Sequence, residues 1–259
     1  MPETAPDAAT SAWPDPVEIL NPAGSSAVLL LCEHASRHIP DEYGGLGLGA
    51  AELKGHIAWD IGARALTKQL SERLDAAAFL GTYSRLLIDL NRPLDVASSI
   101  PVRSEAFDIP GNVAISAEER ARRADRIFTP FHDTVAAAIE ARRARGRATI
   151  IVAVHSFTPV FLGKARPWHA GILFGEASAL GEALVRRLSA DDGLHVGANE
   201  PYKVSREDDY AIPLHGDRLG IPAVLVEIRN DGLAIADGVE AWAERLATAL
   251  HAEAMARAA

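Results

Sequence analysis

Residues 149–157 read TIIVAVHSF, an apolar and largely β-branched run that changes abruptly to histidine and serine. Such a run favours a strand that is buried on both faces, as in a parallel sheet covered by helices. In parallel α/β sheets the ligand crevice lies beyond the carboxyl ends of the strands. The stretch therefore predicts a strand over residues 149–154, with His155 at the edge where such proteins bind ligands.

The same pattern occurs at three other places in the chain. Residues 27–36 read AVLLLCEHAS, residues 86–93 read LLIDLNRP, and residues 222–231 read PAVLVEIRND. Each apolar run is followed by polar or charged side chains, so each is expected to end at the same edge of the sheet. The sequence thus predicts strands over residues 27–33, 86–90 and 222–228.

Helical patterns alternate with these strands. Apolar residues recur at spacings of three and four over residues 57–74, which predicts an amphipathic helix. Ser116 and Glu119 form a capping box that begins a helix reaching about residue 145. The other expected elements are strands over residues 77–80 and 171–174, helices over 176–189, 215–219 and 233–259, and a long loop over 92–115. This alternation predicts an α/β fold with a mixed, mostly parallel sheet and helices on both faces.

Amino-acid composition limits the possible domain organisation, cellular location and binding partners of the protein. Residues 1–20 are acidic and rich in proline and alanine, so we expect a disordered arm before a single domain over residues 21–259. The start lacks the parts of a secretory signal, and no apolar run is long enough to span a bilayer. The single cysteine, Cys32, excludes an intrachain disulfide and favours a cytoplasmic location. A formal net charge of −9 argues against nucleic acid as a partner.

Two histidines are the first candidate metal ligands. His34 and His155 each follow an apolar strand, and imidazole is the commonest metal ligand among side chains. Catalytic zinc takes three protein ligands and leaves one position open. We favour Asp60, expected in the first turn of a helix, as the third ligand, with Glu33 as the alternative. The sequence thus predicts about one Zn²⁺ per chain, whereas the nearby His56 is expected to be solvated.

Glu227 is the candidate general base. It ends a strongly apolar strand, where a carboxylate is costly to bury unless it is paired or binds metal. An apolar wall raises the pKa of a carboxyl group, so that it can accept a proton from water. The alternative is a salt bridge between Glu227 and Arg229.

Asn91, Arg92 and Arg85 are the candidate substrate-binding residues. All three belong to the stretch YSRLLIDLNRP over residues 83–93. A guanidinium binds a carboxylate through two parallel hydrogen bonds, so we expect a substrate with a carboxylate. The alternative for either arginine is a structural salt bridge with Asp89.

Other catalytic designs are excluded. The chain has no G-x-S-x-G nucleophile elbow, and Cys32 lies inside an apolar run, where a thiol is usually inert. The glycine-rich stretch over residues 41–49 lacks the GK[ST] ending of a phosphate-binding loop.

The order of the motifs EHAS, WDIGA, YSRLLIDLNRP, VHSF and VEIRND resembles the N-formylglutamate amidohydrolase family over about residues 27–250. The string YSR-x2-IDLNRP is the most specific of them. The resemblance implies a phosphorylase/hydrolase-like fold, similar to that of zinc carboxypeptidases, and a cytoplasmic location. It also implies release of formate from N-formyl-L-glutamate in histidine breakdown, so the expected partner is a small acidic N-acyl amino acid.

The motifs resemble those of the zinc carboxypeptidases more distantly. In that family a DLNR string binds substrate, an HS string supplies a zinc ligand, and an ELR string supplies the catalytic glutamate. The resemblance implies that Asn91 and Arg92 bind substrate, that His155 is a zinc ligand and that Glu227 is the catalytic glutamate. The H-x-x-E zinc pair is absent, because Arg37 stands three residues after His34. The choice between Asp60 and Glu33 therefore stays open.

Three functions remain in competition. The favoured one is a zinc amidohydrolase that cleaves N-formyl-L-glutamate, or a related N-acyl amino acid, to formate and glutamate. The second is a zinc peptidase or peptidoglycan amidase, against which the lack of a secretory signal argues. The third is a non-catalytic binding relative, against which the presence of His34, His155 and Glu227 argues.

Overall fold

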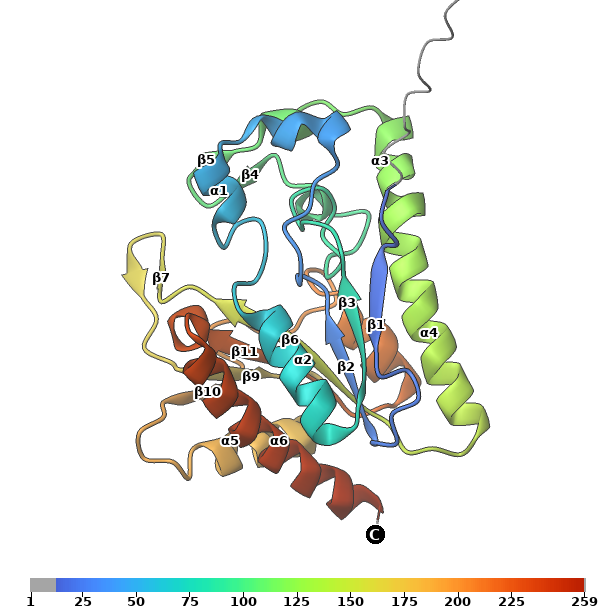
Figure 1. Ribbon diagram of the computed structural model, residues 1–259, viewed down its shortest axis with the longest axis vertical. Coiled ribbons are helices and arrows are strands. Elements are labelled where there is room, and N and C mark those ends of the chain that lie inside the picture. The colour runs from blue at the N-terminus through green and yellow to red at the C-terminus, as the bar shows by residue number, and fades with distance from the viewer. Residues whose placement is uncertain (1–12, 259) are drawn as a thin grey trace, which may run out of the picture.

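A computed structural model describes residues 13–258 of the chain, and its centre is a seven-stranded sheet (Figure 1). The sheet consists of β1 (Val17–Leu20), β3 (Ala77–Gly81), β2 (Val28–Cys32), β6 (Ile150–Phe157), β11 (Ala223–Arg229), β9 (Ala170–Leu173) and β10 (Val196–Ala198), in this order. The four central strands β3, β2, β6 and β11 are parallel. β1 runs antiparallel to β3, and β9 antiparallel to β11. The predicted mixed, mostly parallel α/β fold is confirmed.

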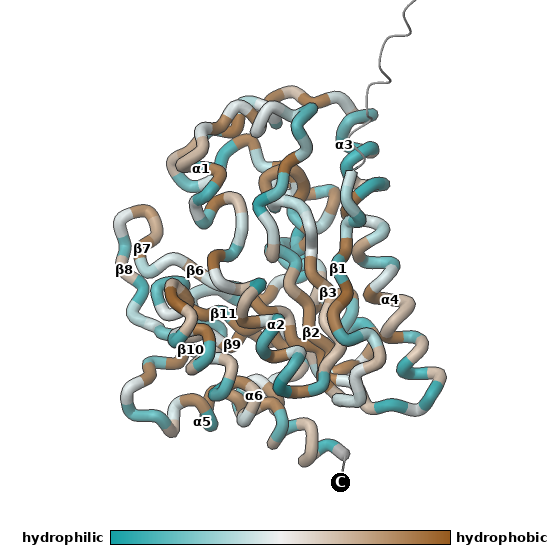
Figure 2. The backbone as a smooth tube through the Cα atoms, viewed as in Figure 1, coloured by the Kyte–Doolittle hydropathy of each residue, from teal (hydrophilic) through white to brown (hydrophobic). Residues whose placement is uncertain are grey.

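Helices cover both faces of the sheet. The helices are α1 (Ala50–Lys54), α2 (Ala63–Leu74), α3 (Ala117–Arg123), α4 (Thr129–Ala144), α5 (Ser178–Leu188) and α6 (Ala236–Ala258). Side chains of α2, α5 and α6 form one hydrophobic core with the sheet, and α4 contributes to a second core on the opposite face. The central strands are largely hydrophobic and α3 is largely hydrophilic (Figure 2). None of the helices formed by residues 13–258 combines the length and the apolar character that crossing a membrane requires.

Two short hairpins lie outside the main sheet. They are β4 (Arg103–Ser104) with β5 (Phe107–Asp108), and β7 (Val160–Phe161) with β8 (Lys164–Ala165). The first belongs to the long loop predicted over residues 92–115. The second follows β6 directly, so it lies next to the carboxyl edge of the sheet (Figure 1).

Side-chain alternation along the strands decides which face holds the reactive groups. In β6, Val154 belongs to the core under α2, α5 and α6, whereas Ala153 belongs to the core on the α4 side. Because successive side chains point to opposite faces, His155 points to the α4 side. Glu227 is the register partner of His155 on β11 and lies on the same face, two residues after Leu225 of the α4-side core.

Residues 86–90, predicted as a strand, form turns instead. The place beside β3 is taken by β1, which pairs with it from Val17 opposite Gly81. The segment satisfies its backbone locally, since Leu87 N donates to Ser84 O and Arg92 N donates to Asp89 O. The apolar run therefore predicts the burial of these residues correctly but predicts the wrong backbone conformation.

The predicted disordered arm over residues 1–20 extends too far into the fold. β1 lies within this range, and the ring of Trp13 packs against Tyr43 and Tyr83 at centroid distances of 5.8 and 5.7 Å. Residues 1–12 lie outside the described residues. β10, a short strand at the other edge of the sheet, is also missing from the prediction.

Helix α2 begins at Ala63 and not at residue 57 as predicted. Gly62, its N-cap, has φ +83, a left-handed conformation that interrupts helical geometry. Asp60 thus lies in the turn before the helix, where its backbone N donates to His34 O at 3.0 Å. This bond ties the turn to the end of β2.

The second long helix begins as predicted. Ser116 Oγ accepts a hydrogen bond from Glu119 N at 3.2 Å, as the capping box requires. α3 then passes through a π-helical turn at Ala124–Phe128 into α4, and Gly146 follows its end with φ +65.

Gly62→Ala is expected to lower the free energy of unfolding by roughly 2–4 kcal/mol. The new methyl group would meet the Cβ of Leu233, and the backbone would have to keep a positive φ. Gly146→Ala is the matched control, because Gly146 also has a positive φ but an added Cβ there meets no atom within 4 Å. Urea denaturation measures both losses. Equal losses in the two variants would mean that the contact with Leu233 contributes nothing.

Candidate metal and catalytic site

A cavity of about 610 Å³ lies at the carboxyl edge of the central strands. Its lining includes all the site residues favoured by the sequence, namely His34, Asp60, Arg85, Asn91, Arg92, His155 and Glu227. A second, open hollow of about 660 Å³ near Arg37 and Gly44 is lined by none of them. The first cavity is therefore the candidate functional site.

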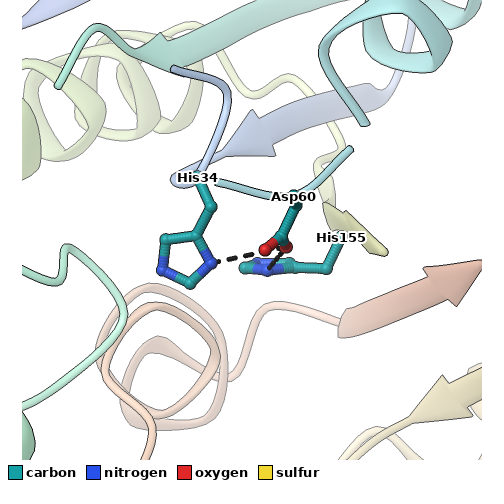
Figure 3. Close-up of side chains that lie close together, drawn as sticks. All are labelled: His34, Asp60 and His155. Carbon is teal, nitrogen blue, oxygen red and sulfur yellow. Dashed lines mark hydrogen bonds and ion pairs between the residues drawn. The ribbon is translucent and has the colours of Figure 1, made fainter. Parts of the chain in front are cut away.

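Asp60 lies between the two predicted histidine ligands (Figure 3). Its Oδ2 is 2.8 Å from His155 Nδ1 and 3.4 Å from His34 Nδ1. One ligand atom from each residue falls within a group no wider than 4.8 Å, and all three residues are buried. The three come from the end of β2, the turn before α2 and the end of β6, which the topology brings together.

A carboxylate contacts the far nitrogen of each imidazole. His34 Nε2 is 2.7 Å from Asp89 Oδ1, and His155 Nε2 is 3.0 Å from Glu33 Oε2. Metal-binding histidines commonly have such a partner, which fixes the orientation and the tautomer of the ring. Glu33, the alternative ligand, thus lies behind His155, away from the three grouped ligand atoms.

The geometry and the charges of this group fit a zinc ion. Zinc bonds of about 2.0–2.2 Å in tetrahedral geometry place ligand atoms roughly 3.3–3.6 Å apart. The contact between Asp60 and His34, at 3.4 Å, already has this length, and that with His155, at 2.8 Å, would have to lengthen. Burial raises the pKa of Asp60, but the two imidazoles outweigh it and hold that pKa well below its usual value. Burial lowers the pKa of His155, yet Asp60 and Glu33 raise it well above its usual value. Asp60 therefore stays ionised, and together with Glu33 it surrounds His155 with negative charge, which a bound cation could also balance.

The carboxylate of Glu227 has no ion-pair partner in the described part of the chain. The residue is 7% exposed, and its Oε2 is buried without a hydrogen bond among residues 13–258. Burial raises the pKa of Glu227 to about 7, although His155 acts in the opposite direction. The alternative salt bridge to Arg229 is wrong, because Arg229 Nε donates to Asp231 Oδ1 at 2.8 Å. Glu227 is therefore free to accept a proton.

The two candidate arginines have different partners. Arg85 donates from Nη2 to Asp89 Oδ2 at 2.8 Å and from Nη1 to Asp60 Oδ1 at 3.3 Å. The structural alternative, a salt bridge with Asp89, thus holds for Arg85. Arg92 instead contacts the carbonyl oxygen of Asp208, and its Nη1 lies 3.9 Å from Asp209 Oδ1. Among the described residues Arg92 has only this distant carboxylate, which leaves it the better placed of the two for a substrate anion.

The Asn91 side chain forms three hydrogen bonds with one loop. Its Oδ1 accepts from the backbone N of Tyr210 and Ala211 at 3.2 and 3.0 Å, and its Nδ2 donates to Asp209 Oδ1 at 3.1 Å. The side chain is buried and joins the turn before Arg92 to the loop over residues 205–211. Asn91 thus holds the position of Arg92 relative to that loop.

Some cavity residues escape the sequence prediction. His56 is not simply solvated, because its Nε2 lies 3.0 Å from Glu105 Oε2 at the cavity wall. Tyr202 lines the same cavity from a loop whose sequence has no periodic pattern. His215 is buried against His132 at 3.0 Å and lies outside the cavity lining. These residues differ in their tertiary contacts, which no local sequence motif reveals.

Together, the sheet, the buried His–Asp–His group and the unpaired glutamate define a hydrolase-like α/β protein with a candidate metal site. The family model of N-formylglutamate amidohydrolase matches residues 26–234. The chain belongs to this family, as its motifs indicated, and this membership supports an amidohydrolase activity.

Two solved structures have a similar fold. The chain is similar to a gene product from Agrobacterium tumefaciens with 39% identity and a TM-score of 0.90, over 94% of this chain and 96% of that one. It is also similar to the N-formylglutamate amidohydrolase from Ralstonia eutropha, with 18% identity and a TM-score of 0.70, over 93% and 97% of the two chains. At that identity the second likeness shows the fold alone. No curated protein matches the chain.

Proposed function

We propose that the chain is a zinc-dependent amidohydrolase that cleaves N-formyl-L-glutamate, or a related acidic N-acyl amino acid, to formate and glutamate. The observation that carries this proposal is the unpaired Glu227 carboxylate beside the group formed by His34, Asp60 and His155. Membership of the N-formylglutamate amidohydrolase family supports the substrate class.

Three residues would hold the metal. His34 and His155 offer Nδ1, and Asp60 offers a carboxylate oxygen, while Asp89 and Glu33 keep the two rings in orientation. A bound zinc ion would polarise the amide carbonyl and lower the pKa of a water molecule.

Glu227 would move the proton in this reaction. Its carboxylate accepts a proton from the attacking water and then gives it to the nitrogen of the leaving amine. A new C–O bond forms on the formyl carbon as its C–N bond breaks, which yields formate and the free amino acid. The apolar surroundings that raise the pKa of Glu227 suit a group that must both accept and donate a proton.

Arg92→Lys is expected to raise KM for carboxylate substrates by on the order of 10- to 100-fold, which corresponds to about 1.4–2.7 kcal/mol. Lysine keeps the positive charge but loses the planar fork that holds a carboxylate through two bonds. Steady-state kinetics with N-formyl-L-glutamate measures the change, and metal content should stay constant.

The control for Arg92 is an N-formylated amine without a carboxylate. This compound should be a poor substrate of the native enzyme and nearly indifferent to the change at Arg92. Equal damage with both compounds would place Arg92 in folding or in the reaction itself, and would remove it from carboxylate recognition.

Two measurements test the proposed function as a whole. Metal analysis of the purified protein should give about one zinc ion per chain, and formate should appear when N-formyl-L-glutamate is added. Cleavage of peptides or of muramoyl-L-alanine amides without formate release would favour the peptidase or amidase alternative. Metal binding without any hydrolysis would favour a binding protein.

A further inference from the structure

Arg166 is a buried cation without a partner for its charge. It follows β8, is 8% exposed, and its Nη1 is enclosed without any hydrogen-bond partner. No ion pair involves it among residues 13–258. Since burying an unpaired charge is costly, such a residue indicates that an anion from outside the chain completes the site.

The other arginines around the cavity each have a carboxylate of the protein nearby. Arg85 has Asp89, and Arg92 lies near Asp209. Arg103 pairs with Asp108 at 2.8 Å. Of these four arginines, Arg166 alone forms no ion pair with a carboxylate of residues 13–258.

Arg166 lies directly behind the aromatic wall of the candidate cavity. Its guanidinium carbon is 4.4 Å from the ring centroid of Phe161, 4.8 Å from that of Tyr202 and 5.8 Å from that of Phe157. All three rings line the cavity. Stacking on ring faces leaves the in-plane N–H groups of a guanidinium available for a carboxylate.

Tyr202 connects this cation to the reaction centre. Burial raises the pKa of Tyr202 and the negative charge of Glu227 raises it further, whereas the charge of Arg166 and a hydrogen bond from it lower that pKa. The Tyr202 ring contacts the Arg166 guanidinium at 4.8 Å and lines the same cavity as Glu227. Tyr202 is 41% exposed, and contact between Arg166 and a ligand in the cavity would require its ring to move aside.

We propose that Arg166 recognises the side-chain carboxylate of the acidic N-acyl amino acid. This inference rests on the proposed function: if Arg92 binds the α-carboxylate, the side-chain carboxylate still needs a cationic partner. A dicarboxylate of glutamate length would use both arginines, whereas a substrate with a neutral side chain would leave Arg166 unpaired. Arg166 would then determine specificity without taking part in bond cleavage.

Arg166→Met tests the inference, because methionine keeps an apolar chain among the rings and removes the charge. The native enzyme should prefer N-formyl-L-glutamate to N-formyl-L-glutamine in kcat/KM by on the order of 10- to 100-fold, and the variant should lose this preference. The reactivity of the glutamine compound should change little. Arg166→Lys, which keeps a charge, should retain part of the preference and guards against misfolding of the methionine variant.

Arg103→Met is the matched control. Arg103 also lines the cavity, but its side chain is 60% exposed and paired with Asp108, so its removal should leave the preference unchanged. An unchanged preference in Arg166→Met would overturn the inference. A fall of equal size for both substrates would also overturn it, because Arg166 would then act on the reaction or on the fold.

Binding of glutarate, the five-carbon dicarboxylate, separates this inference from the proposed function. Calorimetry on the zinc-loaded protein should show glutarate binding to the native chain and to Arg103→Met, and on the order of 10- to 100-fold weaker binding to Arg166→Met. If the native protein releases no formate, the proposed function fails, and glutarate binding still tests Arg166. Equal glutarate affinity in all three proteins would overturn the role of Arg166 even if formate is released.

Discussion

Replacing His155 with alanine is expected to abolish both metal binding and hydrolysis. The imidazole supplies one of three ligand atoms, and its Nδ1 lies only 2.8 Å from Asp60 Oδ2. Two remaining ligands make a poor site for zinc, which needs at least three protein ligands in catalytic centres. Elemental analysis of the dialysed variant should show less than one tenth of the native zinc, and formate release should fall to background.

His132→Ala is the control for this prediction. His132 is also a buried histidine on the α4 side of the sheet, but it contacts His215 and the carbonyl oxygen of Leu90 and lies outside the ligand group. This variant should lose stability and keep its zinc. Full zinc content in His155→Ala would show that the metal site lies elsewhere.

The stability of His155→Ala provides a second measurement. Without the imidazole, the buried carboxylate of Glu33 loses its ion-pair partner among the described residues, while Asp60 keeps His34 and Arg85. Leaving a buried charge unpaired typically costs about 3–5 kcal/mol. Thermal unfolding of the metal-free proteins should therefore show a lower Tm for the variant than for the native chain. An unchanged Tm would mean that these contacts contribute little.

The sequence predicts the central strands because their signal is local. Apolar runs such as residues 150–154 and 223–226 are recognisable without knowledge of their neighbours, and each is buried in the structure. The carboxyl ends of parallel strands share one edge, so polar residues that follow such runs must come together. His34, His155 and Glu227 could be placed in one site by this reasoning alone.

The parts that could not be predicted depend on tertiary pairing. Residues 86–90 are as apolar as a strand, but β1 occupies the place beside β3, and the segment therefore turns. Asp60 approaches His34 because Gly62 delays the start of α2, which periodicity cannot reveal. Arg166 and Tyr202 meet from distant loops without any motif. The sequence thus predicts strand ends well and the loops that complete the cavity poorly.

Glu227→Gln is expected to lower kcat by about 10²–10⁴-fold and to leave the fold and the zinc content intact. The amide has nearly the same shape as the carboxylate but cannot accept a proton from water. Glu227 forms no ion pair in the described residues, and burial already disfavours its charged form, so the neutral side chain should not weaken the protein. Steady-state kinetics, zinc analysis and thermal unfolding measure the three quantities separately.

The control for Glu227 is Glu105→Gln, which removes a carboxylate from the wall of the same cavity. Glu105 lies beside His56 at the β4–β5 hairpin, away from the three ligand atoms, so this variant should keep most of its kcat. Glu227→Asp should fall between the native enzyme and Glu227→Gln, because the carboxylate remains but is set back by one methylene group. A loss below about tenfold in Glu227→Gln is smaller than general base catalysis normally contributes. That result would reject Glu227 as the base and leave its unpaired carboxylate without a catalytic role.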